Sequence, residues 1–163
     1  TGYQKGCRQR YHKQHQGCIL SEKLKRFGCK PKAIVRNSEG WDKLTKKTIV
    51  KGSVTGKVLK SSQPINFLGT IDKKTGSITD QKHNLSGKSI KGSILLFPHG
   101  IGSSVGAYTI YSLKSNNVAP LAMACQKIDL TVASGCALAN IPLFVLSSNE
   151  YDSIKDGDEI SLG

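Results

Sequence analysis

The chain has 163 residues, of which 37% are hydrophobic, and 24 Lys and Arg against 11 Asp and Glu give a formal net charge of +13. That length suits one domain with a substantial core and is short for two. No apolar run approaches the roughly 18 residues of a membrane-spanning helix, and no secretory signal is recognisable, so we expect a cytoplasmic protein without a membrane segment.

The positive charge is concentrated near the N-terminus. Residues 1–50 hold 13 of the 24 Lys and Arg and only 3 of the 11 Asp and Glu. Such a segment attracts phosphate, RNA or an acidic protein partner through a field that is specific for none of them. We therefore predict two parts: a basic N-terminal extension at residues 1–47, with a short helix near residues 21–27, and a domain at residues 48–163.

The chain contains five cysteines and no CxxC pair. They are Cys7, Cys18, Cys29, Cys125 and Cys136. An odd number without a secretory signal favours free thiols in a reducing compartment. Cys125 lies in an apolar run, which predicts a buried and inert thiol. The first three recur every eleven residues, a wider spacing than that of local zinc ligands, so we expect no metal site on this chain.

Beyond residue 47 the sequence alternates short β-type runs with turns. Residues 48–50 and 54–59 are predicted as strands, because both are rich in β-branched residues. Residues 64–69 indicate a short buried piece that ends in a turn, and a second turn at residues 72–76 suggests a hairpin. Residues 93–97 are predicted as a strand that is buried on both faces, because nearly every position is apolar.

The second half continues with short elements. Residues 107–113 have the apolar period of a helix. Residues 121–125 are predicted as another buried strand, residues 131–136 and 142–146 continue that pattern, and a turn near residue 157 leads into a final strand. Many short strands with about two helices predict a mixed α/β domain built in layers, rather than a long doubly wound sheet.

The most informative feature is a glycine-rich turn between a predicted strand and a predicted helix. It reads Gly100-x-Gly102-Ser103-Ser104-x-Gly106. Glycines let a ligand approach the backbone, and a helix N-terminus offers unpaired N–H groups and a partial positive charge to an anion. Capping of the helix by Ser103 or Ser104 explains the two serines equally well from the pattern alone.

Three common motifs do not fit this turn. Residues 102–106 satisfy the G-x-S-x-G pattern of α/β-hydrolases, but that fold needs a histidine after the nucleophile, and none follows His99. The third glycine does not fall at the spacing of a Rossmann fingerprint, and the Gly-Lys-Ser/Thr end of a P-loop is absent. The α/β-hydrolase, Rossmann and P-loop classes are therefore excluded.

The run GSILLFPHGIGSSVGAY at residues 92–108 resembles the signature of the aconitase-X swivelling-domain family. Further motifs match in order and spacing: GKVLKS at 56–61, PINFLG at 64–69, Asp72 to Asp80, NVAP at 117–120, TVASG at 131–135, ANIP at 139–142 and DGD at 156–158. The resemblance covers roughly residues 48–163 and leaves residues 1–47 outside. Because several separated motifs agree, we treat it as specific.

The resemblance implies a swivelling β/β/α domain that closes over a larger catalytic subunit. Archaeal members are two-subunit hydro-lyases that dehydrate (R)-5-phosphomevalonate to trans-anhydromevalonate 5-phosphate in isoprenoid biosynthesis, and bacterial relatives dehydrate cis-3-hydroxyproline. We therefore expect a small subunit that is inactive without its large subunit and that receives a phosphorylated small molecule. An iron–sulfur cluster is expected on the large subunit, and no cofactor on this chain. Residues 1–47 are then either a docking extension or the tail of a fused large subunit.

The family's relation to ordinary aconitase implies roles within the turn. Aconitase carries a Gly-Ser-Ser-Arg turn whose first serine is the catalytic base, and the matching residue is Ser103. Val105 takes the place of the arginine, so other groups must hold a substrate carboxylate. The expected substrate-binding residues are Gly102, Ser104, Val105, Gly106 and His99. For His99, a structural role at the end of a strand is the alternative.

Two alternatives stay open. Within the enzyme class, the sequence does not separate phosphomevalonate from hydroxyproline as the substrate. In a different class, the chain is a non-enzymatic RNA- or protein-binding module that uses residues 1–47, where aromatic side chains lie among basic ones. A salt-dependent RNA affinity that is lost when residues 1–47 are deleted would indicate the binding module.

Overall fold

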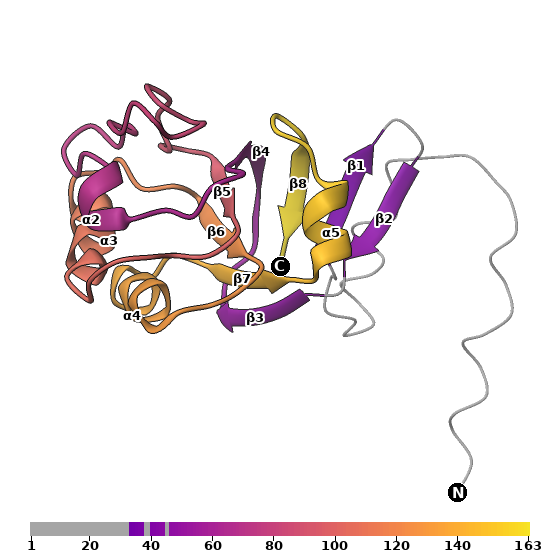
Figure 1. Ribbon diagram of the computed structural model, residues 1–163. Helices are drawn as coiled ribbons and strands as arrows, with labels where there is room; N and C mark the ends of the chain where they lie inside the picture. Colours follow the sequence, from indigo (N-terminus) through magenta and orange to yellow (C-terminus); the bar gives the residue numbers. More distant parts are fainter. Residues whose placement is uncertain (1–32, 38–39, 45) are drawn as a thin grey trace, which may run out of the picture. The chain divides into compact units, whose positions relative to one another are not determined.

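The computed structural model describes residues 33–37, 40–44 and 46–163, with side chains from Lys47 onward (Figure 1). All of them lie in the compact unit Pro31–Gly163. The helix predicted near residues 21–27 and the first three cysteines lie outside the described residues.

Eight strands of the described residues form one sheet with the order β2-β1-β8-β4-β5-β6-β7-β3. Their bounds are β1 Ala33–Asn37, β2 Gly40–Leu44, β3 Lys46–Val50, β4 Val54–Lys60, β5 Ile94–Phe97, β6 Ala122–Cys125, β7 Leu143–Leu146 and β8 Glu159–Leu162. Strands β4 to β7 pair in parallel, and all the flanking pairs are antiparallel. Both β1 and β2 precede residue 48, and the predicted domain boundary at that point stays a prediction.

Strand β4 changes its partner halfway along. Residues 54–57 pair with β8, and residues 58–60 pair with β5. The parallel strands and the β8–β1–β2 group are therefore two sections of one sheet that share β4. The helices are α2 Phe67–Thr70, α3 Gly106–Ser115, α4 Leu130–Ala139 and α5 Ser148–Ser153. Figure 1 shows α2, α3 and α4 on one side of the parallel strands, and α5 beside β8 on the other.

Both faces of the parallel section are buried. Leu95 and Phe97 belong to a core cluster with residues of α3 and α4, and Ile94 and Leu96 belong to a second cluster with residues of α5 and β8. All four are 0% exposed, which confirms the predicted strand buried on both faces. Phe67 of α2 meets Phe97 edge to face, with ring centroids 5.6 Å apart. Burial of such a side chain contributes about 1.5–3 kcal/mol.

The prediction of a strand at residues 131–136 is wrong, because this segment is the middle of helix α4. The side chain of Asp129 accepts a hydrogen bond from the backbone N of Val132 at 3.0 Å and so caps the helix. Asn140 ends it in the left-handed conformation, with φ at 51°. The small residues of this run fit against α3, and neither capping signal was used in the sequence prediction.

Two short helices were also missed. Residues 67–70 form one helical turn, α2, within the segment predicted as a buried piece, and Asn66 caps it. Helix α5 begins with a capping box, in which Ser147 and Glu150 bond each other's backbone N–H. The S-x-x-E spacing is visible in the sequence and could have predicted this helix start. The mixed α/β fold class is nevertheless confirmed.

Candidate functional site

The glycine-rich turn lies at the carboxyl edge of the parallel strands, where the segments that follow β4, β5 and β6 meet. The backbone N of Ile65 donates to the carbonyl of His99 at 3.2 Å, and the backbone N of Ile101 donates to the carbonyl of Ile65 at 3.0 Å. From the segment after β6, Asp129 packs against Gly100, where an added Cβ would overlap its Oδ2. Three separate segments therefore build one site.

Ser103 lies at the surface, just before α3 begins. Its Oγ accepts a hydrogen bond from the backbone N of Val105 at 3.3 Å, and its carbonyl accepts one from the backbone N of Gly106 at 2.9 Å. Ser104 and Val105 are exposed as well, and Gly106 is buried. The backbone N–H groups of Ser103 and Ser104 have no acceptor among the described residues. The arrangement can therefore stabilise an oxygen that carries negative charge, through unpaired N–H groups and the helix N-terminus.

The turn depends on two glycines that contact neighbouring side chains. Gly102 has φ at 104°, and a Cβ there would lie 2.7 Å from Oδ1 of Asn66. At Gly106 a Cβ would lie 3.0 Å from the side chain of Thr131, in the first turn of α4. The starts of α3 and α4 therefore lie side by side. The structure thus brings together the five predicted residues 102–106 with residues that the sequence analysis did not name.

Asn66 and Asp129 are the residues that sequence reasoning missed. Each precedes a helix and caps it: Oδ1 of Asn66 accepts from the backbone N of Leu68 at 3.2 Å, and Oδ1 of Asp129 accepts from that of Val132. Oδ2 of Asp129 is buried and has no hydrogen-bond partner among the described residues. Asn and Asp are favoured N-cap residues, so the cap preference is the signal that could have found both.

His99 is half-buried at the end of β5, and its side chain makes no hydrogen bond among the described residues. Only its carbonyl is engaged, by the backbone N of Ile65. The structure therefore places the predicted residue next to the turn, and its binding role stays a prediction.

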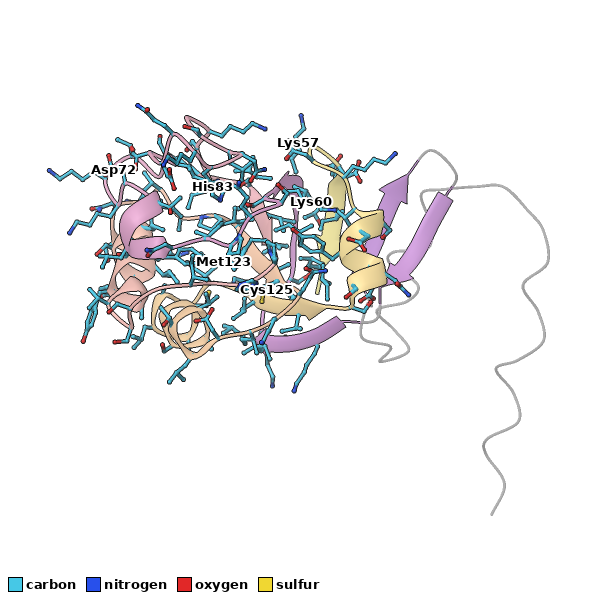
Figure 2. The ribbon with its side chains drawn as sticks, viewed as in Figure 1. Lys57, Lys60, Asp72, His83, Met123 and Cys125 are labelled. Carbon is cyan, nitrogen blue, oxygen red and sulfur yellow. The ribbon has the colours of Figure 1, made fainter. Side chains whose placement is uncertain are left out.

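A buried serine and a histidine meet in the segment between β4 and β5, and Figure 2 labels the histidine, His83. Oγ of Ser61 is 3.2 Å from Nε2 of His83, whose Nδ1 accepts from the backbone N of Leu85 at 3.2 Å. In a neutral imidazole the other nitrogen then carries the proton, so His83 donates to Ser61 and is not its base. Both side chains are buried, and burial lowers the pKa of His83. This pair is a structural link, not a nucleophile.

The described cysteines are core residues. Cys125 and Met123 lie on β6 (Figure 2) and are at most 1% exposed. Burial raises the pKa of the Cys125 thiol to about 12 and also raises that of Cys136. The predicted burial of Cys125 is confirmed, and its inertness stays a prediction. No group of three or more His, Cys, Asp and Glu in the described part could hold a metal ion, and these two thiols do not fit an iron–sulfur cluster.

Exposed apolar side chains occur on the same three segments that build the site, within the turn and next to it in sequence. Leu68 comes from α2, Ile101 and Val105 from the turn, Tyr108 from α3 and Leu130 from α4; we call these five residues the apolar rim. Tyr108 is 70% exposed and Leu130 is 83% exposed. No helix of the described residues is long and apolar enough to cross a membrane. Residues 1–32, which make up most of the basic N-terminal segment, lie outside the described residues.

A family model for the aconitase X swivel domain matches residues 43–163. The chain belongs to this family, which confirms the resemblance and the expected type of fold.

Relatives and solved structures make the likeness more specific. The phosphomevalonate dehydratase small subunit of Methanosarcina acetivorans is 46% identical over 121 residues, which cover 74% of this chain and 84% of the relative. That of Thermococcus kodakarensis is 45% identical over 118 residues, covering 72% and 87%. The holo-form crystal structure of Thermococcus kodakaraensis aconitase X matches with a TM-score of 0.69 at 39% identity, covering 72% of this chain and 88% of that one.

Proposed function

We propose that the chain is the small subunit of a hydro-lyase that dehydrates (R)-5-phosphomevalonate to trans-anhydromevalonate 5-phosphate, with Ser103 as the base that removes the carbon-bound proton. The observation that carries this proposal is the exposed Ser103 hydroxyl, held at the start of α3 by the backbone N–H of Val105. The names of the relatives supply the reaction. Dehydration of cis-3-hydroxyproline by the same site is the alternative.

Loss of water next to a carboxylate needs a base for the proton and an acid for the leaving hydroxyl. A serine becomes a useful base only where donors stabilise the negative oxygen. The turn supplies such donors: the N–H of Val105 lies 3.3 Å from Oγ, and the N–H of Ser104 is unpaired. Gly102, Ser104, Val105, Gly106 and His99 line the space for substrate oxygens. The acid for the leaving hydroxyl is not on this turn, and we assign it to the partner.

The partner is a large catalytic subunit, which also carries the iron–sulfur cluster. The name small subunit in the relatives supports such an assembly. The apolar rim supports it independently, because exposed leucine and tyrosine side chains around a reactive hydroxyl favour contact with a protein. Closure over the rim excludes water from Ser103 and strengthens its interaction with the N–H groups. The isolated chain is therefore inactive.

The base is tested in the reconstituted complex of both subunits. Ser103→Ala should lower kcat by about two to four orders of magnitude, the usual contribution of a general base. Ser89→Ala is the matched control, because Oγ of Ser89 also accepts a 3.3 Å hydrogen bond from the backbone N of the residue two positions later, Lys91. Ser89 is exposed and lies outside the glycine-rich turn. The control should stay within twofold of wild type. A Ser103→Ala complex that keeps a tenth of the wild-type kcat would refute the role, and the same assay with cis-3-hydroxyproline decides the substrate.

The partner surface is tested with two exposed leucines of the same helix. Leu130 begins α4 in the apolar rim, and Leu138 lies near its other end, 64% exposed. Leu130→Asp should raise the Kd for the large subunit at least tenfold, measured by calorimetric titration, and Leu138→Asp should leave it unchanged. A Leu130→Asp variant that raises the Kd no more than Leu138→Asp does would show that the apolar rim is not the interface.

A further inference from the structure

Only the oxygen of the Asn66 side-chain amide makes hydrogen bonds among the described residues. Its Oδ1 accepts hydrogen bonds from the backbone N of Leu68 at 3.2 Å and of Gly69 at 3.3 Å, and so caps α2. Its Nδ2 has no acceptor among the described residues, although the residue is half-buried. Two amide N–H donors are therefore available beside the glycine-rich turn.

The position of this amide is fixed by the residue that precedes Ser103. A Cβ on Gly102 would lie 2.7 Å from Oδ1 of Asn66 and 3.3 Å from Nδ2. The amide therefore packs directly on the Cα of Gly102, one residue from the hydroxyl proposed as the base. Its orientation is held by the two capping bonds, so little side-chain freedom is lost when the free N–H groups bind a ligand.

We propose that Asn66 is a substrate-binding residue whose Nδ2 donates a hydrogen bond to the carboxylate of the substrate. The inference rests on the proposed function, because it takes Ser103 as the base. The proton that a base removes in this reaction comes from the carbon attached to the carboxylate, so the carboxylate lies one bond from the reacting carbon. A donor next to the base is then within reach of it.

The electrostatics of the turn favour a donor of this kind. As the proton leaves, negative charge moves from the carbon onto the carboxylate oxygens, and a hydrogen bond to them strengthens. Residues 99–106 contain no Lys or Arg. What these residues offer a carboxylate, which can only accept hydrogen bonds, is therefore mainly neutral N–H donors.

Capping alone does not account for an amide at this position. An N-cap needs only an oxygen acceptor, and Asp or Ser caps a helix about as well as Asn. The nitrogen of Asn66 adds nothing to the cap. Asn66→Asp therefore separates the two roles: it keeps the capping oxygen and replaces the two donors by a charged acceptor.

The test uses the reconstituted two-subunit complex. Asn66→Asp should lower kcat/KM at least 30-fold, because a hydrogen bond to a charged group contributes about 10- to 100-fold and the new charge repels the substrate. The thermal midpoint and the affinity for the large subunit should not change. Asn149→Asp is the matched control, since Asn149 is exposed in α5 on the opposite side of the sheet and the charge change is the same.

A second measurement distinguishes binding from a structural role. The anhydro acid product and its carboxamide are compared as inhibitors of the wild-type and Asn66→Asp complexes. The variant should shift the ratio of their inhibition constants at least tenfold toward the carboxamide, which can donate to the new carboxylate. An equal weakening of both inhibitors, or a variant kcat/KM within twofold of wild type, overturns the inference alone. A wild-type complex that dehydrates neither candidate substrate overturns the proposed function and this inference with it.

Discussion

The contact between Gly102 and Asn66 can be measured by a double-mutant cycle on the isolated chain. Gly102 has φ at 104°, and an alanine methyl group would lie 2.7 Å from Oδ1 and 3.0 Å from Cγ of Asn66. Gly102→Ala therefore strains the backbone and pushes the Asn66 side chain away from its capping position. Both effects destabilise the folded chain.

The size of each effect follows from its cause. A non-glycine residue in a disfavoured backbone region costs about 1–3 kcal/mol. Loss of an N-cap costs about 1 kcal/mol. We therefore expect Gly102→Ala to lower the free energy of unfolding by about 2–4 kcal/mol. With Asn66→Ala already present, no cap is left to lose, and the Gly102→Ala cost should fall by about 1 kcal/mol.

Urea unfolding followed by circular dichroism gives the four free energies of the cycle. Gly92→Ala is the control for the backbone term, because Gly92 has φ at 68° and a Cβ there meets nothing within 4 Å. Gly92→Ala should lower the free energy of unfolding by the same amount with and without Asn66→Ala. A coupling between positions 102 and 66 below about 0.3 kcal/mol would show that the two residues do not touch, and the geometry of the site would be wrong.

Two further predictions concern buried groups. Because burial lowers the pKa of His83 below its ordinary 6.5, the unfolded chain binds that proton more tightly. The contribution of neutral His83 to stability is complete above pH 6.5 and is lost as the pH falls through the lower pKa of the folded chain. His83→Gln should therefore make the free energy of unfolding depend less on pH between pH 7 and pH 5. Cys125, with its pKa raised to about 12, should resist iodoacetamide at pH 8 in the folded chain and react after unfolding. Mass spectrometry of the tryptic peptides measures the labelling in both states.

The core of the fold could be predicted from short-range patterns. The apolar run that ends at Phe97 gave a strand buried on both faces, and the helix after the glycine-rich turn was placed within two residues of its bounds, Gly106–Ser115. Residues 131–136 were taken for a strand because a run of small apolar residues has no distinct period. Only the caps, Asp129 and Asn140, mark it as a helix.

The site could be predicted only in part, for a similar reason. The turn itself is contiguous in sequence, so its serines and glycines were visible together. Asn66 lies 36 positions before Gly102, and Asp129 lies 29 positions after Gly100; no local pattern joins them. Their meeting depends on the parallel order of β4, β5 and β6, which places all three strand ends at one edge. Sequence periodicity does not determine that order.

The absence of Lys and Arg from the turn supports the proposal that a partner completes the site. The chain carries 24 Lys and Arg, yet residues 99–106 contain none. As the proposed base, Ser103 would rely on backbone N–H groups and a helix N-terminus, whose effect is weak while water surrounds the exposed hydroxyl. Under the proposed function, the large subunit covers the apolar rim, removes that water and brings the acid for the leaving hydroxyl. In this account the same closure assembles the catalytic groups and makes the serine basic, so binding to the large subunit and activity should be lost together in Leu130→Asp.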